Sequence, residues 1–199
     1  MGLIVGLDEV GRGCWAGPLV AAAVVLSPNL VIPGLNDSKK LTKSQRRVLS
    51  VAIHGSAAAA GIGWVSSAVI DSLGLTVAVG LAMQAAITQV IQSIGETPSS
   101  ILIDGNYNFL PMYSGVTTIV RGDGSIPEIS AASIIAKVAR DNFMADAANK
   151  YPNYGFEKHV GYGTAQHNAA LRTYGVTPLH RMSFKPVRAV QLVRIQKRG

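Results

Sequence analysis

Two acidic residues, Asp8 and Glu9, stand together at the end of an apolar, β-prone run at residues 3–7. The run predicts a buried strand, where acids are unfavourable and costly to bury without a partner. Two adjacent carboxylates repel each other, and without a counter-charge one of them would have to take up a proton. A divalent cation would remove the conflict. The alternative interpretation is a solvated acidic turn at the strand end.

The residues that follow suit contact with a ligand. Gly11 and Gly13 allow a close approach of the backbone, and Arg12 between them offers a guanidinium to an anion. A surface arginine in a turn is the alternative.

Two further acids lie at or just beyond the ends of predicted strands, Asp104 after residues 100–103 and Asp123 after residues 115–120. In open α/β sheets, ligands bind beyond the carboxyl ends of the strands, so Asp8 and Asp104 converge if their strands are adjacent and parallel. Carboxylates without His or Cys suit Mg²⁺ or Mn²⁺ better than Zn²⁺. One Asp-Gly pair is ordinary turn sequence, but only eleven acids are present, which makes their repetition at strand ends informative.

A predicted helix over residues 125–150 carries a polar line. Ser125 to Glu128 has the form of a capping box with an early proline. Ser130, Ser133, Lys137 and Arg140 then follow at helical spacing, where hydroxyls and cations could hold phosphate oxygens. A solvated helix face is the alternative, and Asp141 is placed to pair with Lys137.

Positive charge is concentrated in the last quarter of the chain. Residues 1–150, called the body below, hold ten basic and ten acidic residues, whereas residues 151–199, the tail, hold eight basic residues and one acid. Such a basic segment fits a polyanion partner or a solvated, solubilising face. Tyr162 lies between Gly161 and Gly163, free to stack on a sugar or base, or else to cover the core.

The order of elements predicts a mixed α/β sheet flanked by helices, whose first three strands form a meander. Strands are expected at 3–9, 17–26, 61–66, 100–104 and 115–120, and helices at 42–53, 76–94, 125–150, 164–174 and 186–196. The tail cannot bury a core of its own and should pack on the body as a helical appendage. The nearest approach to a membrane span, residues 16–26, is too short, no secretory signal is expected, and the single cysteine, Cys14, fits a packing residue in a reducing cytoplasm.

Six blocks spread in order over nearly the whole chain resemble the ribonuclease HII family. They are Gly-Leu-Asp-Glu-Val-Gly-Arg-Gly at 6–13, Asp-Ser-Lys-Lys-Leu at 37–41, Asp-Gly at 104–105, Gly122-Asp123 with residues 129–141, Gly-Tyr-Gly-Thr at 161–164 with His167, and His-Arg-Met-Ser-Phe at 180–184. Val160 departs from the family pattern, in which a lysine is frequent.

The resemblance implies a ribonuclease H-like catalytic domain at 1–150 and a basic helical appendage at 151–199. It also implies cleavage of RNA in RNA–DNA hybrids and incision 5′ of single ribonucleotides in duplex DNA, as in ribonucleotide excision repair, leaving 5′-phosphates. Two Mg²⁺ or Mn²⁺ ions, roughly 4 Å apart, would activate a water and stabilise the leaving oxygen. Their ligands, and the catalytic residues, would be Asp8, Glu9, Asp104 and Asp123.

Substrate contacts follow from the same resemblance. Gly11, Arg12 and Gly13 would read the ribose 2′-OH, Tyr162 would lie against the junction sugar, and Lys39, Ser133 and Lys137 would contact phosphates. A cytoplasmic monomer without a membrane partner is expected. Two weaker alternatives stay open: another ribonuclease H-like nuclease that acts on DNA and ignores the 2′-OH, and a non-catalytic nucleic-acid binding module.

Overall fold

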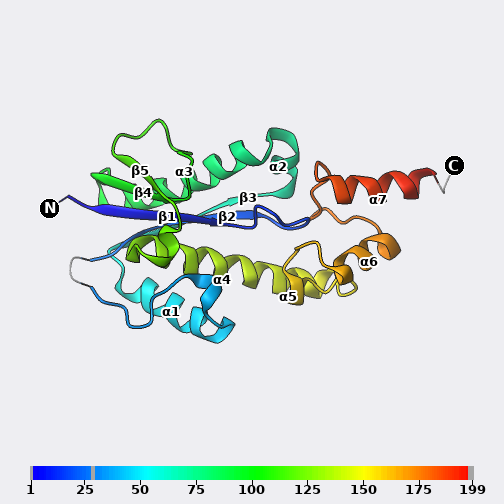
Figure 1. The fold of residues 1–199 in the computed structure, drawn as a ribbon, viewed down its shortest axis with the longest axis horizontal. Coiled ribbons are helices and arrows are strands. Elements are labelled where there is room, and N and C mark those ends of the chain that lie inside the picture. The colour runs from blue at the N-terminus through cyan, green and yellow to red at the C-terminus, as the bar shows by residue number, and fades with distance from the viewer. Residues whose placement is uncertain (1, 28–29, 197–199) are drawn as a thin grey trace.

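The protein, seen here in a computed structural model that describes residues 2–27 and 30–196, is built on one five-stranded sheet of order β3-β2-β1-β4-β5 (Figure 1). Three strands, β1 (Ile4–Val10), β2 (Leu19–Val25) and β3 (Ala59–Val65), form an antiparallel meander. Two more, β4 (Ser100–Asp104) and β5 (Val116–Ile119), extend the sheet parallel to β1. The predicted mixed sheet with an initial meander is therefore confirmed.

The strand register brings two of the predicted acids to one edge of the sheet. Leu7 of β1 pairs with Ile103 of β4 in parallel register, so Asp8 and Asp104 follow at the same level. Residue Asp104 also pairs with Ile119 at the end of β5. The strands β1 and β4 are thus parallel neighbours, which is the condition for Asp8 and Asp104 to converge.

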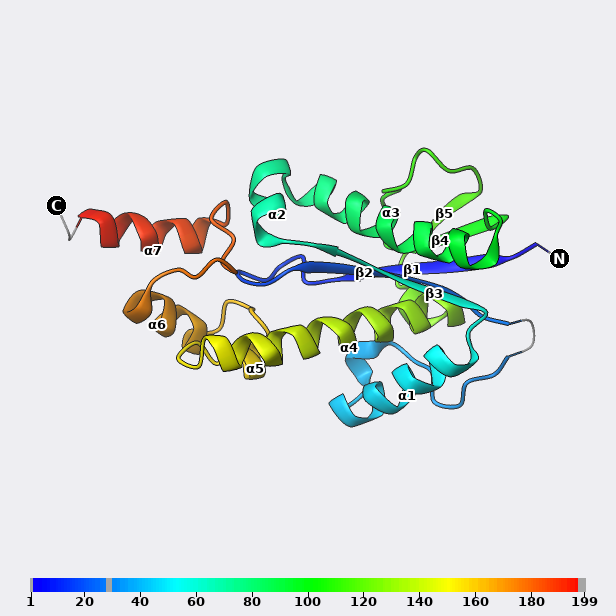
Figure 2. The ribbon, with the colours of Figure 1, turned by 180° about the vertical axis from the view of Figure 1, so that it is seen from behind.

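Helices cover both faces of the sheet (Figures 1 and 2). On one face lie α2 (Ser67–Leu73) and α3 (Leu75–Ile94), and on the other α1 (Lys43–Ser56) and α4 (Pro127–Lys150). Helix α4 contacts β1 so closely that a Cβ on Gly6 would collide with the backbone of Glu128 and Ile129. This close packing brings the first turns of α4 beside the acid-bearing strand ends.

One helix of the described residues, α3, is long and apolar enough to cross a membrane by length and composition alone. Residues 16–26, the segment considered from the sequence, instead include the buried strand β2, so α3 is the stronger candidate on those two criteria. In the structure, one face of α3 packs against the sheet in the core, with residues that include Ala82, Met83 and Ala86.

The tail contributes α5 (Phe156–His159), α6 (Ala165–Tyr174) and α7 (Lys185–Gln196) at the end of the molecule opposite the N-terminus (Figure 1). Tyr154 and Phe156 pack with Met144 of α4 and Ala16 in a core cluster separate from the two beside the sheet. Arg181 is fully buried and donates hydrogen bonds to the carbonyls of Gly17 and Arg12. This cation of the tail therefore serves packing.

Local sequence signals predicted one helix start correctly and another incorrectly. The capping box at Thr42 and Gln45 is present, whereas the one expected at Ser125 is wrong. Helix α4 begins at Pro127 after Ile126, which offers no side-chain cap, because residues 122–124 form a short 3-10 turn (η2) that carries Ser125 away from the helix start. The short helices α2 and α5 were not expected.

Candidate active site

Three carboxylates meet at the edge of the sheet. Asp8 of β1, Asp104 of β4 and Asp123 of the η2 turn, named the acid cluster here, each offer an oxygen within 4.8 Å of the others. Asp8 and Asp123 are buried, and the Asp123 amide donates to the Asp104 carboxylate at 3.4 Å. The sheet register places the first two acids, and the turn after β5 returns the third toward them.

The fourth predicted acid, Glu9, borders this cluster without being one of its three members. One of its oxygens accepts from the Arg12 guanidinium at 3.1 Å. The other oxygen, Oε2, is buried and has no hydrogen-bond partner among the described residues. A buried carboxylate oxygen without a partner is costly, so Glu9 has an unused site for a cation or a donor.

Burial and mutual repulsion disfavour the charged form of these acids. The pKa of Asp8 is raised to about 8 by burial and by the charges of Glu9 and Asp104. Burial also raises the pKa of Glu9 and of Asp104. The Lys39 ammonium contacts Asp123 at 2.9 Å and offsets part of the negative charge. Converging carboxylates, an unpartnered oxygen and raised pKa values together fit a site for divalent cations.

A pocket of about 230 Å³ opens beside the acids. Its lining includes Asp8, Glu9 and Asp104 and every residue that the sequence analysis assigned to the substrate, namely Gly11, Arg12, Gly13, Lys39, Ser133, Lys137 and Tyr162. These residues come from five separate parts of the chain. The structure therefore brings the predicted acids and substrate contacts into one place.

The glycine loop after β1 has a conformation that a side chain would strain. Gly11 has a φ of 96°, and a Cβ there would collide with the Arg140 side chain and approach the Pro18 carbonyl. The Arg12 guanidinium lies 5.6 Å from the centre of the Phe109 ring while it contacts Glu9. Arg12 is thus held at the pocket rim, next to the buried Gly11 that also lines the pocket.

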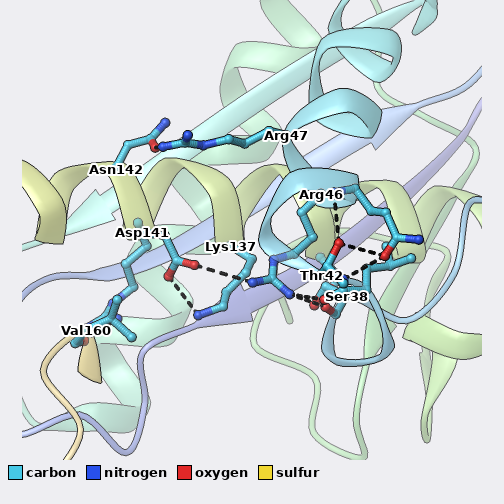
Figure 3. Close-up of polar contacts among 12 residues, drawn as sticks. Ser38, Thr42, Arg46, Arg47, Lys137, Asp141, Asn142 and Val160 are labelled. Atoms are coloured by element: carbon cyan, nitrogen blue, oxygen red, sulfur yellow. Dashed lines mark hydrogen bonds and ion pairs between the residues drawn. The ribbon is translucent and has the colours of Figure 1, made fainter. Parts of the chain in front are cut away.

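Two ion pairs fix the cationic side of the pocket (Figure 3). Lys137 contacts Asp141 at 2.7 Å, which confirms the pairing expected from their spacing. Arg46 of α1, which the sequence analysis missed, lies 3.8 Å from Asp141 and donates to the Ser38 carbonyl at 2.9 Å. Arg46 therefore anchors the turn that carries Lys39, and only the fold reveals this because its acceptors are backbone carbonyls.

The predicted polar line on α4 divides into two parts. Ser133 and Lys137 line the pocket, and Ser133 also bonds Ser38 through its hydroxyl at 2.9 Å. The hydroxyl of Ser130 donates to the Asp123 carbonyl at 2.6 Å and so holds the η2 turn. Both serines are buried rather than part of a solvated face.

Arg140 was expected to share this phosphate-facing line, and that expectation is wrong. It is fully buried and donates to the carbonyls of Pro18, Val160 and Ala16 at 2.9, 2.8 and 3.1 Å. The physical reason is that residues 16–18 and the tail loop cross α4 at this turn, and their carbonyls need donors. Arg140 therefore joins the tail to the body.

The loop that carries Tyr162 is tightly held although Tyr162 itself is 43% exposed. Trp15 donates its amide to the Gly161 carbonyl at 2.8 Å, and Gly161, with a φ of 87°, leaves no room for a Cβ beside the Ala16 carbonyl. Beneath the loop lie three buried histidines, His159, His167 and His180, to which the sequence analysis gave no role.

Comparison with known proteins gives one consistent family. The family profile described as Ribonuclease HII matches residues 5–187. The ribonuclease HII of Geobacillus sp. (strain WCH70) is 46% identical over 196 residues, which cover 98% of this chain and 68% of that protein. The ribonuclease HII of Nitrosospira multiformis is 48% identical over 185 residues, which cover 93% of this chain and 90% of that protein.

Solved structures agree on the architecture. The RNase HII of Archaeoglobus fulgidus, solved in a complex with PCNA, aligns with a TM-score of 0.76 at 25% identity, over 92% of this chain and 95% of that one. The ribonuclease H2 of Pyrococcus horikoshii OT3 aligns with a TM-score of 0.75 at 24% identity, over 98% of this chain and 99% of that one. The second likeness shows the fold alone, and it confirms the predicted ribonuclease H-like class.

Proposed function

The chain belongs to the ribonuclease HII family, and from that premise we propose that its acid cluster cuts RNA in RNA–DNA hybrids and incises duplex DNA 5′ of single ribonucleotides. Membership makes the chain a nuclease and a hydrolase of the ribonuclease H type. The observation that carries the proposal is the meeting of Asp8, Asp104 and Asp123 beside a pocket lined by the glycine loop and Tyr162.

Asp8, Glu9, Asp104 and Asp123 are the proposed catalytic residues and the ligands of two divalent cations, Mg²⁺ or Mn²⁺. Held by these residues, the cations would supply an activated water and stabilise charge on the leaving 3′-oxygen, which would leave a 5′-phosphate on the product. The unpartnered Oε2 of Glu9 and the raised pKa of Asp8 support this assignment. No serine or cysteine nucleophile is needed.

The remaining pocket residues orient the substrate. The backbone of Gly11, Arg12 and Gly13 reads the 2′-OH, the feature that distinguishes RNA from DNA at a single site. The Tyr162 ring lies against the sugar at the junction between ribonucleotide and deoxyribonucleotide.

Phosphate contacts fall to the polar residues on the other side of the pocket. Lys39, Lys137 and the Ser133 hydroxyl contact the backbone of the cleaved strand. All three already have a partner in the protein, since Lys39 contacts Asp123, Lys137 contacts Asp141 and the Ser133 hydroxyl bonds that of Ser38. These ion pairs hold the ammonium groups at the pocket before substrate arrives.

The tail acts as a basic appendage on a catalytic body of residues 1–150. Because Arg181 is buried, phosphate binding in the described tail falls to its exposed cations, which are Lys158, Arg172, Lys185 and Arg188. Such contacts make binding salt-dependent. We place the protein in the cytoplasm as a monomer that removes misincorporated ribonucleotides.

A cleavage assay on three labelled duplexes tests the proposal: all DNA, DNA with one ribonucleotide, and an RNA–DNA hybrid, each with Mg²⁺, Mn²⁺ or EDTA. We expect metal-dependent cutting 5′ of the lone ribonucleotide and within the hybrid, with the DNA duplex intact. Cutting of the hybrid alone would remove the junction role of Tyr162. Cutting of plain DNA would point to another ribonuclease H-like nuclease, and binding without cutting to a non-catalytic module.

A further inference from the structure

Three histidines of the tail form a buried group directly beneath the Tyr162 loop, named the histidine cluster here. His159 ends α5, His167 lies in the first turn of α6, and His180 precedes α7. All three are buried, with exposed fractions of 7%, 0% and 2%. Buried imidazoles must have hydrogen-bond partners, and the identity of those partners defines where each ring carries its proton.

The hydrogen bonds of His180 and His167 form a chain in which each donor points toward the Tyr162 carbonyl. The Thr177 amide donates to His180 Nδ1 at 2.9 Å, so that nitrogen carries no proton and the neutral ring is protonated on Nε2. Nε2 of His180 faces Nε2 of His167 at 3.0 Å, so His167 accepts there. The proton of His167 must then be on Nδ1, which donates to the Tyr162 carbonyl at 2.9 Å.

His159 fixes the other side of the same loop. Its Nδ1 accepts from the Gly161 amide at 3.2 Å, which leaves the proton on Nε2 to donate to the Tyr154 carbonyl at 2.7 Å. Its ring stacks on that of His167, with centres 4.6 Å apart and planes inclined by 12°. The amide before Tyr162 and the carbonyl of Tyr162 are therefore both held by imidazoles.

The cluster requires neutral rings. A proton added to His167 would place two N–H groups face to face at the 3.0 Å contact with His180, and a proton added to Nδ1 of His180 would face the Thr177 N–H at 2.9 Å. Burial lowers the pKa of both rings to about 4, and the charges of the other histidines act in the same direction.

The charged and titratable groups around the rings leave that neutrality intact. Tyr154 faces His180 with its ring and donates its hydroxyl to the Gly175 carbonyl. Arg181, next to His180 in the chain, directs its guanidinium to the Gly17 and Arg12 carbonyls. Phe156 and Trp15 supply apolar ring surface against His167.

We propose that His167, supported by His180 and His159, is a positioning residue that holds Tyr162 at the pocket and thereby sets the preference for single-ribonucleotide junctions. The inference rests on the proposed junction role of Tyr162. None of the three histidines lines the pocket. They act through the backbone on either side of Tyr162, so hybrid cleavage, which the acid cluster performs, depends on them less.

The first test reads the protons directly. Ring ¹⁵N NMR of the whole protein at neutral pH is expected to show His167 protonated on Nδ1, and His159 and His180 on Nε2. On lowering the pH, His167 and His180 should stay neutral well below the pH at which a free histidine titrates. A proton on Nε2 of His167, or a charged His167 or His180 near pH 6, would overturn the proposal without reference to activity.

The second test compares two substitutions of His167 on two substrates. An asparagine can reproduce the Nδ1–H donor, whereas a leucine of similar size cannot. For His167→Leu we expect the ratio of kcat/KM on the single-ribonucleotide duplex to that on the hybrid to fall about tenfold, the scale of one lost buried hydrogen bond. His167→Asn should keep the ratio within about threefold of the parent protein.

The outcomes separate this inference from the proposed function. Equal losses on both substrates for His167→Leu, or a similar ratio for Leu and Asn, would show that the donor does not position Tyr162. If Tyr162→Ala itself lowers kcat/KM equally on both substrates, the ring has no junction role, and the proposed preference for junctions fails with it. The NMR result then still decides whether the histidines hold the loop. Should the leucine variant not fold, the asparagine variant and the wild-type spectra give the answer.

Discussion

Two polar clusters lie near the pocket, the acid cluster beside it and the histidine cluster under the Tyr162 loop, and they differ in how the cost of burying polar groups is met. In the acid cluster, Asp8 and its neighbours are like charges whose ionised form is disfavoured. In the histidine cluster, each ring nitrogen of His167 has a partner within 3.0 Å, and the group is complete within the protein. The first arrangement suits a cation, whereas the second holds the backbone around Tyr162, and this difference predicts how each cluster responds to mutation and pH.

The largest expected effect is on the chemistry of the acid cluster. Asp8→Asn removes a buried carboxylate that no other residue can replace, so cleavage of both substrates should fall by about 10³-fold or more. Binding of the hybrid in Ca²⁺ should survive because the pocket keeps its shape. Single-turnover cleavage and a filter-binding assay measure the two quantities.

A matched control for Asp8→Asn is Asp146→Asn, which changes an exposed acid on α4 and should leave cleavage unchanged. Normal turnover by the Asp8 variant would remove Asp8 from the proposed metal site. Equal losses in the two variants would indicate a general effect of net charge on folding or binding.

The second effect concerns what the histidine cluster supports. Tyr162→Ala removes a stacking surface, which in nucleic-acid complexes contributes about 1–3 kcal/mol. We expect a loss of about ten- to a hundredfold in kcat/KM on the single-ribonucleotide duplex and a smaller loss on the long hybrid. The exposed Tyr174 of α6 gives the control, since Tyr174→Ala should affect neither substrate. Equal losses for Tyr162→Ala on both duplexes would contradict a junction role.

The third effect is on stability, and its sign differs between the clusters. Because the pKa of Asp8 rises from 3.8 to about 8 on folding, the folded state holds more protons between these values, and the free energy of unfolding falls as pH rises. For His167 and His180 the pKa falls from 6.5 to about 4, so the unfolded state holds more protons and stability rises with pH over that interval. Above pH 6.5 only the decrease in the free energy of unfolding that comes from Asp8 remains.

Urea unfolding in EDTA across this pH range checks both slopes. Asp8→Asn should remove most of the decline and make the metal-free protein more stable by about 2 kcal/mol near the upper end. His167→Asn should reduce the increase in the free energy of unfolding with pH that is expected at acid pH. Added Mg²⁺ should stabilise the parent protein and have a much smaller effect on the Asp8 variant. A decline that persists in Asp8→Asn would assign the cost to another group.

The sequence was informative where the signal is local. An apolar run followed by an acid predicts a strand end, and Asp8 and Asp104 could be placed in this way. Their meeting required β1 and β4 to be parallel neighbours, which the order of elements allowed but did not impose. Arg140 was misplaced because helical spacing says nothing about the segments that cross a helix.

The histidine cluster could not be predicted for a related reason. His159, His167 and His180 lie in α5, in α6 and in the segment before α7, and each by itself resembles an ordinary core or surface histidine. Only packing of the tail brings the rings within 3.0 Å of one another or into a stack. The same holds for Arg46, whose hydrogen-bond acceptors are backbone carbonyls that no sequence pattern marks.

The smallest expected effect concerns an acid with complete partners. Asp71 of α2 accepts from the amides of Met182 and Ser183 at 2.7 and 2.9 Å and from the Ser183 hydroxyl at 2.6 Å. Asp71→Asn keeps one acceptor oxygen and loses the charge, so we expect the free energy of unfolding to fall by about 1 kcal/mol.

Chemistry should not change in this variant, because Asp71 lies outside the pocket and its donors are neutral groups of the tail. Single-turnover kcat should match that of Glu96→Gln, which alters an exposed acid after α3. A fall in kcat at constant stability would mean that Asp71 holds the geometry of the pocket as well as the tail. The half-buried Asp71 is satisfied by donors of the chain, whereas the neighbours of the buried Asp8 are other acids, and we therefore expect a cation only at Asp8.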